Sequence, residues 1–130
     1  MDSICVYCGS ANQASQKYFQ AARRMGETLV RRGLTLVYGG GKTGLMGALA
    51  DSVVDGGGKA IGVIVETMNT HKLAHTHLTR MEVTPTIHQR KKRMYELAID
   101  PEIASSMRDL RKPRDENLCS MCAELCALRE

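Results

Sequence analysis

The stretch Leu36-Val37-Tyr38-Gly39-Gly40-Gly41-Lys42-Thr43-Gly44-Leu45-Met46-Gly47 places a glycine-rich loop between two apolar segments. Glycine permits positive φ and lets the backbone approach a ligand closely, so a strand that ends in glycines and leads into a helix is typical of nucleotide-binding α/β proteins. The first turn of such a helix also presents unpaired N–H groups to a phosphate. The stretch therefore predicts an α/β fold with an anion-binding loop.

Three interpretations of this loop compete. A Walker A loop requires glycine six residues before the lysine of Gly41-Lys42-Thr43, and Leu36 stands there, so that interpretation fails. A dinucleotide fingerprint, Gly39-x-Gly41-x-x-Gly44, needs an acid after the next strand, and Glu66 is near that place, although the loop follows the second strand and not the first. The third interpretation is a tight turn that binds nothing.

Apolar runs on both sides of the loop alternate with helical patterns. We expect strands at residues 3–7, 34–38, 60–65 and 81–84, and helices at 13–32, 45–54 and 86–99. This alternation predicts a partial Rossmann-like parallel sheet with flanking helices and right-handed crossovers. The polar segment 68–80 is expected to be a loop with three solvated histidines, His71, His75 and His77.

The composition changes after residue 100. Residues 101–130 show no strand pattern and two weak helix patterns, so we expect an unrelated tail, helical or disordered, after a nucleotide-binding segment at 1–100. The tail contains Cys119-x2-Cys122-x3-Cys126, which together with Cys5-x2-Cys8 suggests zinc ligands. Because Cys5 should point into the sheet, we expect no metal site.

The composition of the chain gives little support for a nucleic-acid or membrane partner. The net charge is +4, Trp is absent and Phe occurs once, which gives little support for stacking on nucleic acid. No apolar run reaches the roughly eighteen residues of a membrane span, and the N-terminus lacks the pattern of an export signal. Five cysteines then predict reduced thiols in the cytoplasm.

Longer strings resemble the Lonely Guy family in order and spacing over roughly residues 3 to 100. They are Cys5-Val6-Tyr7-Cys8-Gly9-Ser10, Leu36-Val37-Tyr38-Gly39-Gly40-Gly41, Gly44-Leu45-Met46-Gly47, Gly62-Val63-Ile64 and His88-Gln89-Arg90-Lys91. The resemblance implies a Rossmann-like cytoplasmic homodimer without a cofactor. It further implies hydrolysis of nucleoside 5′-monophosphates, cytokinin nucleotides or AMP, to free base and ribose 5-phosphate.

The resemblance also implies site residues. Arg90 and Lys91 match the family's catalytic Arg-Lys pair, in which the arginine orients substrate, and an arginine suits phosphate or ribose oxygens because its planar fork stays charged. The residues implied to bind substrate are Gly9, Ser10, Gly40, Gly41, Gly44 and Met46. Without the resemblance, the basic cluster from Arg90 to Arg93 would be interpreted as a solvated helix face.

One departure from the family is large. Its continuation, Pro-Gly-Gly-x-Gly-Thr-x-x-Glu, is absent after Ala98-Ile99-Asp100, and the abrupt break favours a shifted reading frame over a natural truncation. Cleaving an N-glycosidic bond needs a carboxylate to stabilise the oxocarbenium-like ribose, so we expect activity lower by orders of magnitude. A non-catalytic nucleotide-binding or dimerising remnant and a dinucleotide-binding protein remain alternative hypotheses.

Overall fold

The computed structural model describes residues 3–97, 102–103, 106 and 110 of the chain. The expectations for the end of the last helix and for most of the 101–130 tail, including Cys119, Cys122 and Cys126, lie outside these residues.

Four parallel strands form one sheet in the order β1 (Ser3–Cys5), β2 (Thr35–Tyr38), β3 (Ala60–Val65) and β4 (Arg80–Thr84). The two central strands are buried on both faces, as strands between two helical layers are. The two edge strands, β1 and β4, contain no fully buried residue. The predicted parallel α/β sheet is confirmed, and the fold is Rossmann-like.

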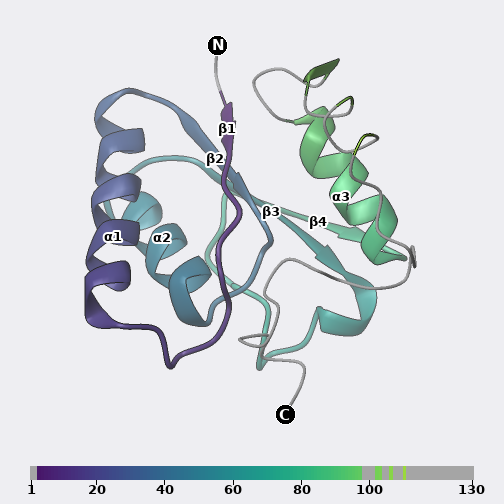
Figure 1. Ribbon diagram of the computed structural model, residues 1–130, viewed down its shortest axis with the longest axis horizontal. Helices are drawn as coiled ribbons and strands as arrows, with labels where there is room; N and C mark the ends of the chain where they lie inside the picture. Colours follow the sequence, from purple (N-terminus) through teal and green to yellow (C-terminus); the bar gives the residue numbers. More distant parts are fainter. Residues whose placement is uncertain (1–2, 98–101, 104–105, 107–109, 111–130) are drawn as a thin grey trace.

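Three α-helices within residues 3–97 flank the sheet. Figure 1 shows α1 (Gln16–Arg31) and α2 (Gly44–Asp55) together on one face and α3 (Ile87–Glu96) on the other. The two helices of the first face pack closely because Gly26 lacks a Cβ, which would lie 2.6 Å from the Cβ of Ser52. The chain leaves α1 through Gly33, whose φ of 64° is the left-handed conformation that glycine adopts readily.

The predicted bounds needed small corrections. The first helix begins at Gln16 and not at residue 13, because Ser15 is its extended N-cap. The first strand ends at Cys5, although the N–H of Val6 still donates to the carbonyl of Val37. A 3-10 helix at Glu66–Met68, which the sequence pattern did not indicate, follows β3.

The two faces of the sheet bury different amounts of apolar surface. One large cluster of buried side chains joins α1 and α2 to the sheet, namely Leu29, Leu36, Tyr38, Met46, Leu49, Ala50, Val53 and Ala60. Under α3 the buried cluster consists of Val37, Val63 and Met94. The helices in the described part of the chain are all too short or too polar to cross a membrane.

Candidate nucleotide-binding site

The loop after β1 and the glycine loop after β2 are tied together at the carboxyl end of the sheet. The hydroxyl of Thr43 donates to the carbonyl of Ser10 at 2.7 Å, and the N–H of Gly44 donates to Oδ1 of Asn12 at 2.9 Å. Gly44 has a φ of 62°, and a Cβ there would lie 2.4 Å from the carbonyl carbon of Ser10. Glycine is therefore required both by the backbone conformation and by the close approach of the first loop.

These contacts correct the expectation that the first turn of α2 offers unpaired N–H groups to a phosphate. Asn12 from the first loop accepts from Gly44, and the carbonyl of Gly9 accepts from the N–H of Met46 at 3.2 Å. The first loop therefore caps α2 at two of its first three N–H groups. A phosphate bound by this site would have to meet the glycine loop itself or displace the cap.

The glycine loop is held from below by Tyr38, the last residue of β2. Its hydroxyl donates to the carbonyl of Gly41 at 2.9 Å, and the side chain is fully buried. Burial raises the pKa of this phenol above its ordinary value, and the nearby Asp51 carboxylate raises it further. The phenol therefore remains protonated and keeps donating to the loop.

Arg90 reaches the same loop from the opposite face of the sheet. It lies on α3, is 5% exposed, and donates from Nε to the carbonyl of Val63 at 2.7 Å and from Nη2 to that of Gly39 at 2.7 Å. Val63 lies within β3 and Gly39 directly follows the neighbouring strand β2, so the guanidinium lies beneath the start of the glycine loop. The alternative interpretation of a solvated helix face is therefore wrong for Arg90.

The other basic residues of α3 are placed differently. Lys91 is half-buried, and consecutive helix residues point about 100° apart, so it does not share the direction of Arg90. Arg93 lies at the surface and pairs with Glu82 on β4 and Glu96 on its own helix. Arg90, and not Lys91, is the member of the predicted pair that contacts the glycine loop in the described part of the chain.

Cys5 lies near the buried arginine. It packs against the small cluster under α3, as expected for a strand residue that points into the sheet. Burial raises the pKa of its thiol, while a hydrogen bond with Tyr7 and the charge of Arg90 oppose the increase. The ring of Tyr7 contacts the ring of Tyr95 at 6.2 Å between centroids, which joins the loop after β1 to α3.

The histidine-containing segment after β3 departs most from expectation. His71 and His77 are exposed, as predicted, but His75 is 9% exposed and its Nε2 lies 2.7 Å from Oδ1 of Asp51 on α2. The prediction of three solvated histidines is therefore wrong for His75. The signal that could have revealed it is the apolar pair Leu73-Ala74 directly before it, since Ala74 is also buried.

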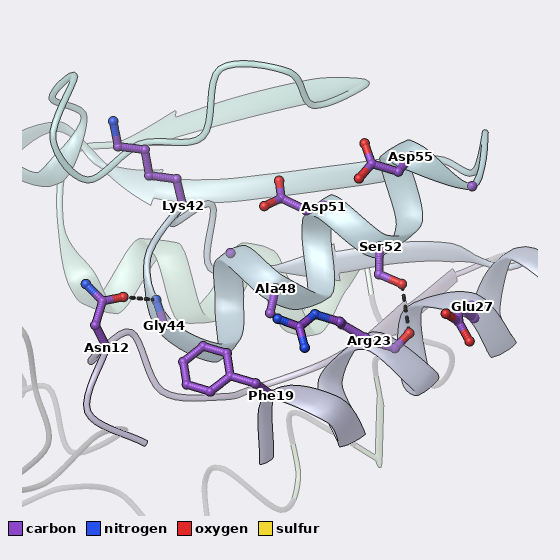
Figure 2. A pocket seen from close by; sticks show the side chains of 12 residues that line it. Asn12, Phe19, Arg23, Glu27, Lys42, Gly44, Ala48, Asp51, Ser52 and Asp55 are labelled. Carbon is purple, nitrogen blue, oxygen red and sulfur yellow. Dashed lines mark hydrogen bonds between the residues drawn. The ribbon is translucent and has the colours of Figure 1, made fainter. Parts of the chain in front are cut away.

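A groove of mixed charge lies beside the loops on the outer side of α1 and α2. Figure 2 shows Asn12 meeting the Gly44 amide at one end, while Arg23 and Phe19 lie below α2. Lys42 and Asp51 extend to the other side of α2, away from Phe19. Gly44 is the one predicted site residue that lines this groove in the described ranges, so the groove meets the predicted site at Gly44.

The structure therefore assembles the predicted residues into two connected groups. Gly9, Ser10, Gly44 and Met46 join the first loop to α2, while Arg90 reaches the start of the glycine loop at Gly39. Gly40 and Gly41 lie between the groups. Glu66, the acid of the dinucleotide hypothesis, is exposed at the first residue of the 3-10 helix.

Comparison with known families identifies the class of protein. The SLOG cluster4 family matches residues 3–99. The chain therefore belongs to the SLOG cluster4 family, which confirms the Lonely Guy resemblance.

Three relatives named cytokinin riboside 5′-monophosphate phosphoribohydrolase are similar to it. The protein of Rhodococcoides fascians is 44% identical over 73% of this chain and 48% of its own length. That of Oryza sativa subsp. japonica is 41% identical over 73% of this chain and 39% of its own. One from Arabidopsis thaliana is 42% identical over 70% and 42%. The chain thus spans less than half the length of these relatives.

Two solved structures share the fold. The molybdenum cofactor binding protein of Rippkaea orientalis has a TM-score of 0.63 and 20% identity, over 86% of this chain and 73% of that one. The molybdenum cofactor carrier protein of Chlamydomonas reinhardtii has a TM-score of 0.61 and 19% identity over the same shares, 86% and 73%. At such identity the likeness shows the fold alone.

Proposed function

We propose that this chain binds a nucleoside 5′-monophosphate, a cytokinin riboside 5′-monophosphate or AMP, and that its activity is that of a phosphoribohydrolase. The observation that carries the proposal is the buried guanidinium of Arg90 against the carbonyl of Gly39, at the start of the glycine loop. A buried positive charge at this place favours a phosphorylated ligand. The names of the relatives support the choice of substrate class.

In this proposal the two loops and Arg90 have separate roles. Gly9 and Ser10 line the pocket on one side, and Gly40, Gly41, Gly44 and Met46 surround the nucleotide on the other. Arg90 orients the ribose phosphate, for which a fixed planar cation is better suited than a flexible lysine. Lys91, the other member of the basic pair, adds a second positive charge on the same helix.

Breaking the N-glycosidic bond leaves positive charge on the ribose, which a carboxylate must stabilise while water attacks. The motif Pro-Gly-Gly-x-Gly-Thr-x-x-Glu, which would supply that carboxylate, does not occur in this sequence. We therefore propose that this chain retains nucleotide binding and turns substrate over slowly. We also propose a cytoplasmic homodimer, on the basis of the family resemblance.

The test is release of free base from AMP and from a cytokinin riboside 5′-monophosphate by the full chain, measured by chromatography. We expect release above the uncatalysed rate, slower by orders of magnitude than that of a relative with the complete motif. Arg90→Ala should abolish it, while Arg93→Ala, which removes a surface arginine of the same helix, should not. Binding without release would favour the non-catalytic alternative. The proposal would be contradicted if the chain neither bound these nucleotides nor released base from them.

A further inference from the structure

The segment from His71 to His75 lies along the glycine loop as a short antiparallel partner. The N–H of Lys42 donates to the carbonyl of Leu73 at 2.9 Å, and the N–H of His75 donates to the carbonyl of Gly40 at 3.0 Å. Between them Gly41 and Ala74 form an antiparallel bridge. Backbone hydrogen bonds from the 71–75 segment therefore hold the glycine loop, although this segment belongs to no helix or strand of the sheet.

That segment is in turn tied to α2 through the side chain of His75. The ring of His75 donates from Nε2 to Oδ1 of Asp51 on α2 at 2.7 Å, and its Nδ1 accepts from the N–H of His77 at 3.0 Å. Since Nδ1 accepts, the proton of the neutral ring is on Nε2, which directs it at the carboxylate. The His75 side chain is 6% exposed while that of Asp51 is 61% exposed, so the anchor reaches from the interior to the helix surface.

The anchor matters because of what it holds. Gly40 has a φ of 76°, and consecutive glycines at 39–41 have many accessible conformations of which a ligand needs one. The contact of His75 with the Gly40 carbonyl is made by the residue whose ring is fixed to α2. A loop ordered before the ligand arrives binds more tightly, because the ordering cost is not taken from the binding free energy.

We propose that His75 and Asp51 are positioning residues of the nucleotide loop: by fastening the 71–75 segment to α2, they hold Gly40 to Lys42 in the ligand-binding conformation. The consequence for nucleotide affinity rests on the function proposed above. The ordering of the loop does not depend on that function, because it is a property of the protein without ligand. The two parts therefore have separate measurements.

The first measurement is hydrogen exchange of the Lys42 amide, which donates to Leu73, in the full chain without nucleotide. In His75→Ala the protection of this amide should fall by roughly tenfold or more, because local opening becomes easier. Asp51→Ala should act in the same direction, and His75→Gln, which can still donate toward Asp51, should restore part of the protection. His71→Ala and Asp55→Ala, matched changes on the same segment and helix, should leave it unchanged.

The second measurement is the dissociation constant for AMP. If the competent loop is populated about a tenth of the time in His75→Ala, the affinity falls about tenfold. Val53→Ala removes a fully buried side chain of α2 and serves as a control for lost stability. It should lower the unfolding midpoint at least as much as His75→Ala, with AMP affinity within about twofold of the unmodified chain.

Unchanged protection of the Lys42 amide in His75→Ala would overturn the positioning role. Equal losses of AMP affinity in His75→Ala and Val53→Ala would overturn it as well, since the effect would then follow stability alone. Absence of AMP binding by the unmodified chain would overturn the proposed function, and the exchange experiment would still decide whether His75 and Asp51 order the loop.

Discussion

The two faces of the sheet bury different chemistry. The face covered by α1 and α2 has the larger apolar cluster, which includes the fully buried Leu49 and Val53. The face under α3 has a small apolar cluster around Met94 and, beside it, the buried guanidinium of Arg90. Burying a charge costs stability unless its donors are satisfied, and here backbone carbonyls accept from it. The difference indicates that apolar burial on the first face stabilises the fold. This stability offsets the cost of burying the Arg90 charge on the second face, under the glycine loop.

The largest expected loss of stability comes from truncating a buried side chain in the larger apolar cluster. Leu49→Ala should lower the free energy of unfolding by about 2–5 kcal/mol, because it leaves a cavity in the larger cluster. Met94→Ala should cost less, near the lower end of that range, since the smaller cluster can relax around it. Urea unfolding of both variants measures the difference. A greater loss from Met94→Ala would reverse the comparison.

The next effect concerns the junction of the two loops. Ala at Gly44 would have both a positive φ and a Cβ 2.4 Å from Ser10, whereas Gly33, with a φ of 64°, has open space around its Cβ position. Gly33→Ala should cost about 1–2 kcal/mol for the backbone conformation alone. Gly44→Ala should cost more and also weaken AMP binding. Equal losses in the two variants would show that the loops are not held in contact.

The third effect separates the two arginines of α3. Arg90→Ala leaves the carbonyls of Val63 and Gly39 without this donor, which should cost about 1–3 kcal/mol in total. Arg93→Ala breaks only surface ion pairs, worth up to about 1 kcal/mol. Thermal unfolding of the two variants compares them. If Arg93→Ala proved the more destabilising, the burial of Arg90 would not matter as described.

The smallest effect is a loss of stability at high pH. Burial raises the pKa of the Cys5 thiol above its ordinary 9.0, so the folded chain keeps this proton to a higher pH than the unfolded chain. The stability that this protonated thiol contributes is complete below about pH 9. It is lost as the pH rises through the pKa of Cys5 in the folded chain. The unfolding midpoint should therefore decline above pH 9, and less steeply in Cys5→Ala. Identical slopes would contradict the assignment to Cys5.

The strands and helices could be predicted because the sequence signals for them are local. The apolar run before Gly39 and the helical spacing before Gly33 each determine one element, and the alternation of elements determines a parallel sheet. The contact of Arg90 with the glycine loop followed from no pattern in the basic cluster, where a solvated face was the simpler interpretation. The family resemblance singled out Arg90, and the structure shows the burial that distinguishes it from Arg93.

Two features of the site could not be predicted because they depend on contacts between segments distant in sequence. Asn12 caps α2 at Gly44 across thirty-two positions, and a lone asparagine in a turn gives no sign of such a partner. His75 meets Asp51 across twenty-four positions, in a segment whose polarity indicated solvent. In both cases the local composition predicts a loop, but it does not indicate which distant residue the loop contacts.

We propose that the glycine loops and Arg90 form a site for a nucleoside 5′-monophosphate. The most direct test is calorimetric titration of the full chain with AMP and with adenosine, which differ only in the phosphate. We expect AMP to bind at least about tenfold more tightly, and this preference to disappear in Arg90→Ala that remains folded by circular dichroism. Equal affinities for the two ligands, or a preference for AMP that survives Arg90→Ala, would contradict the account.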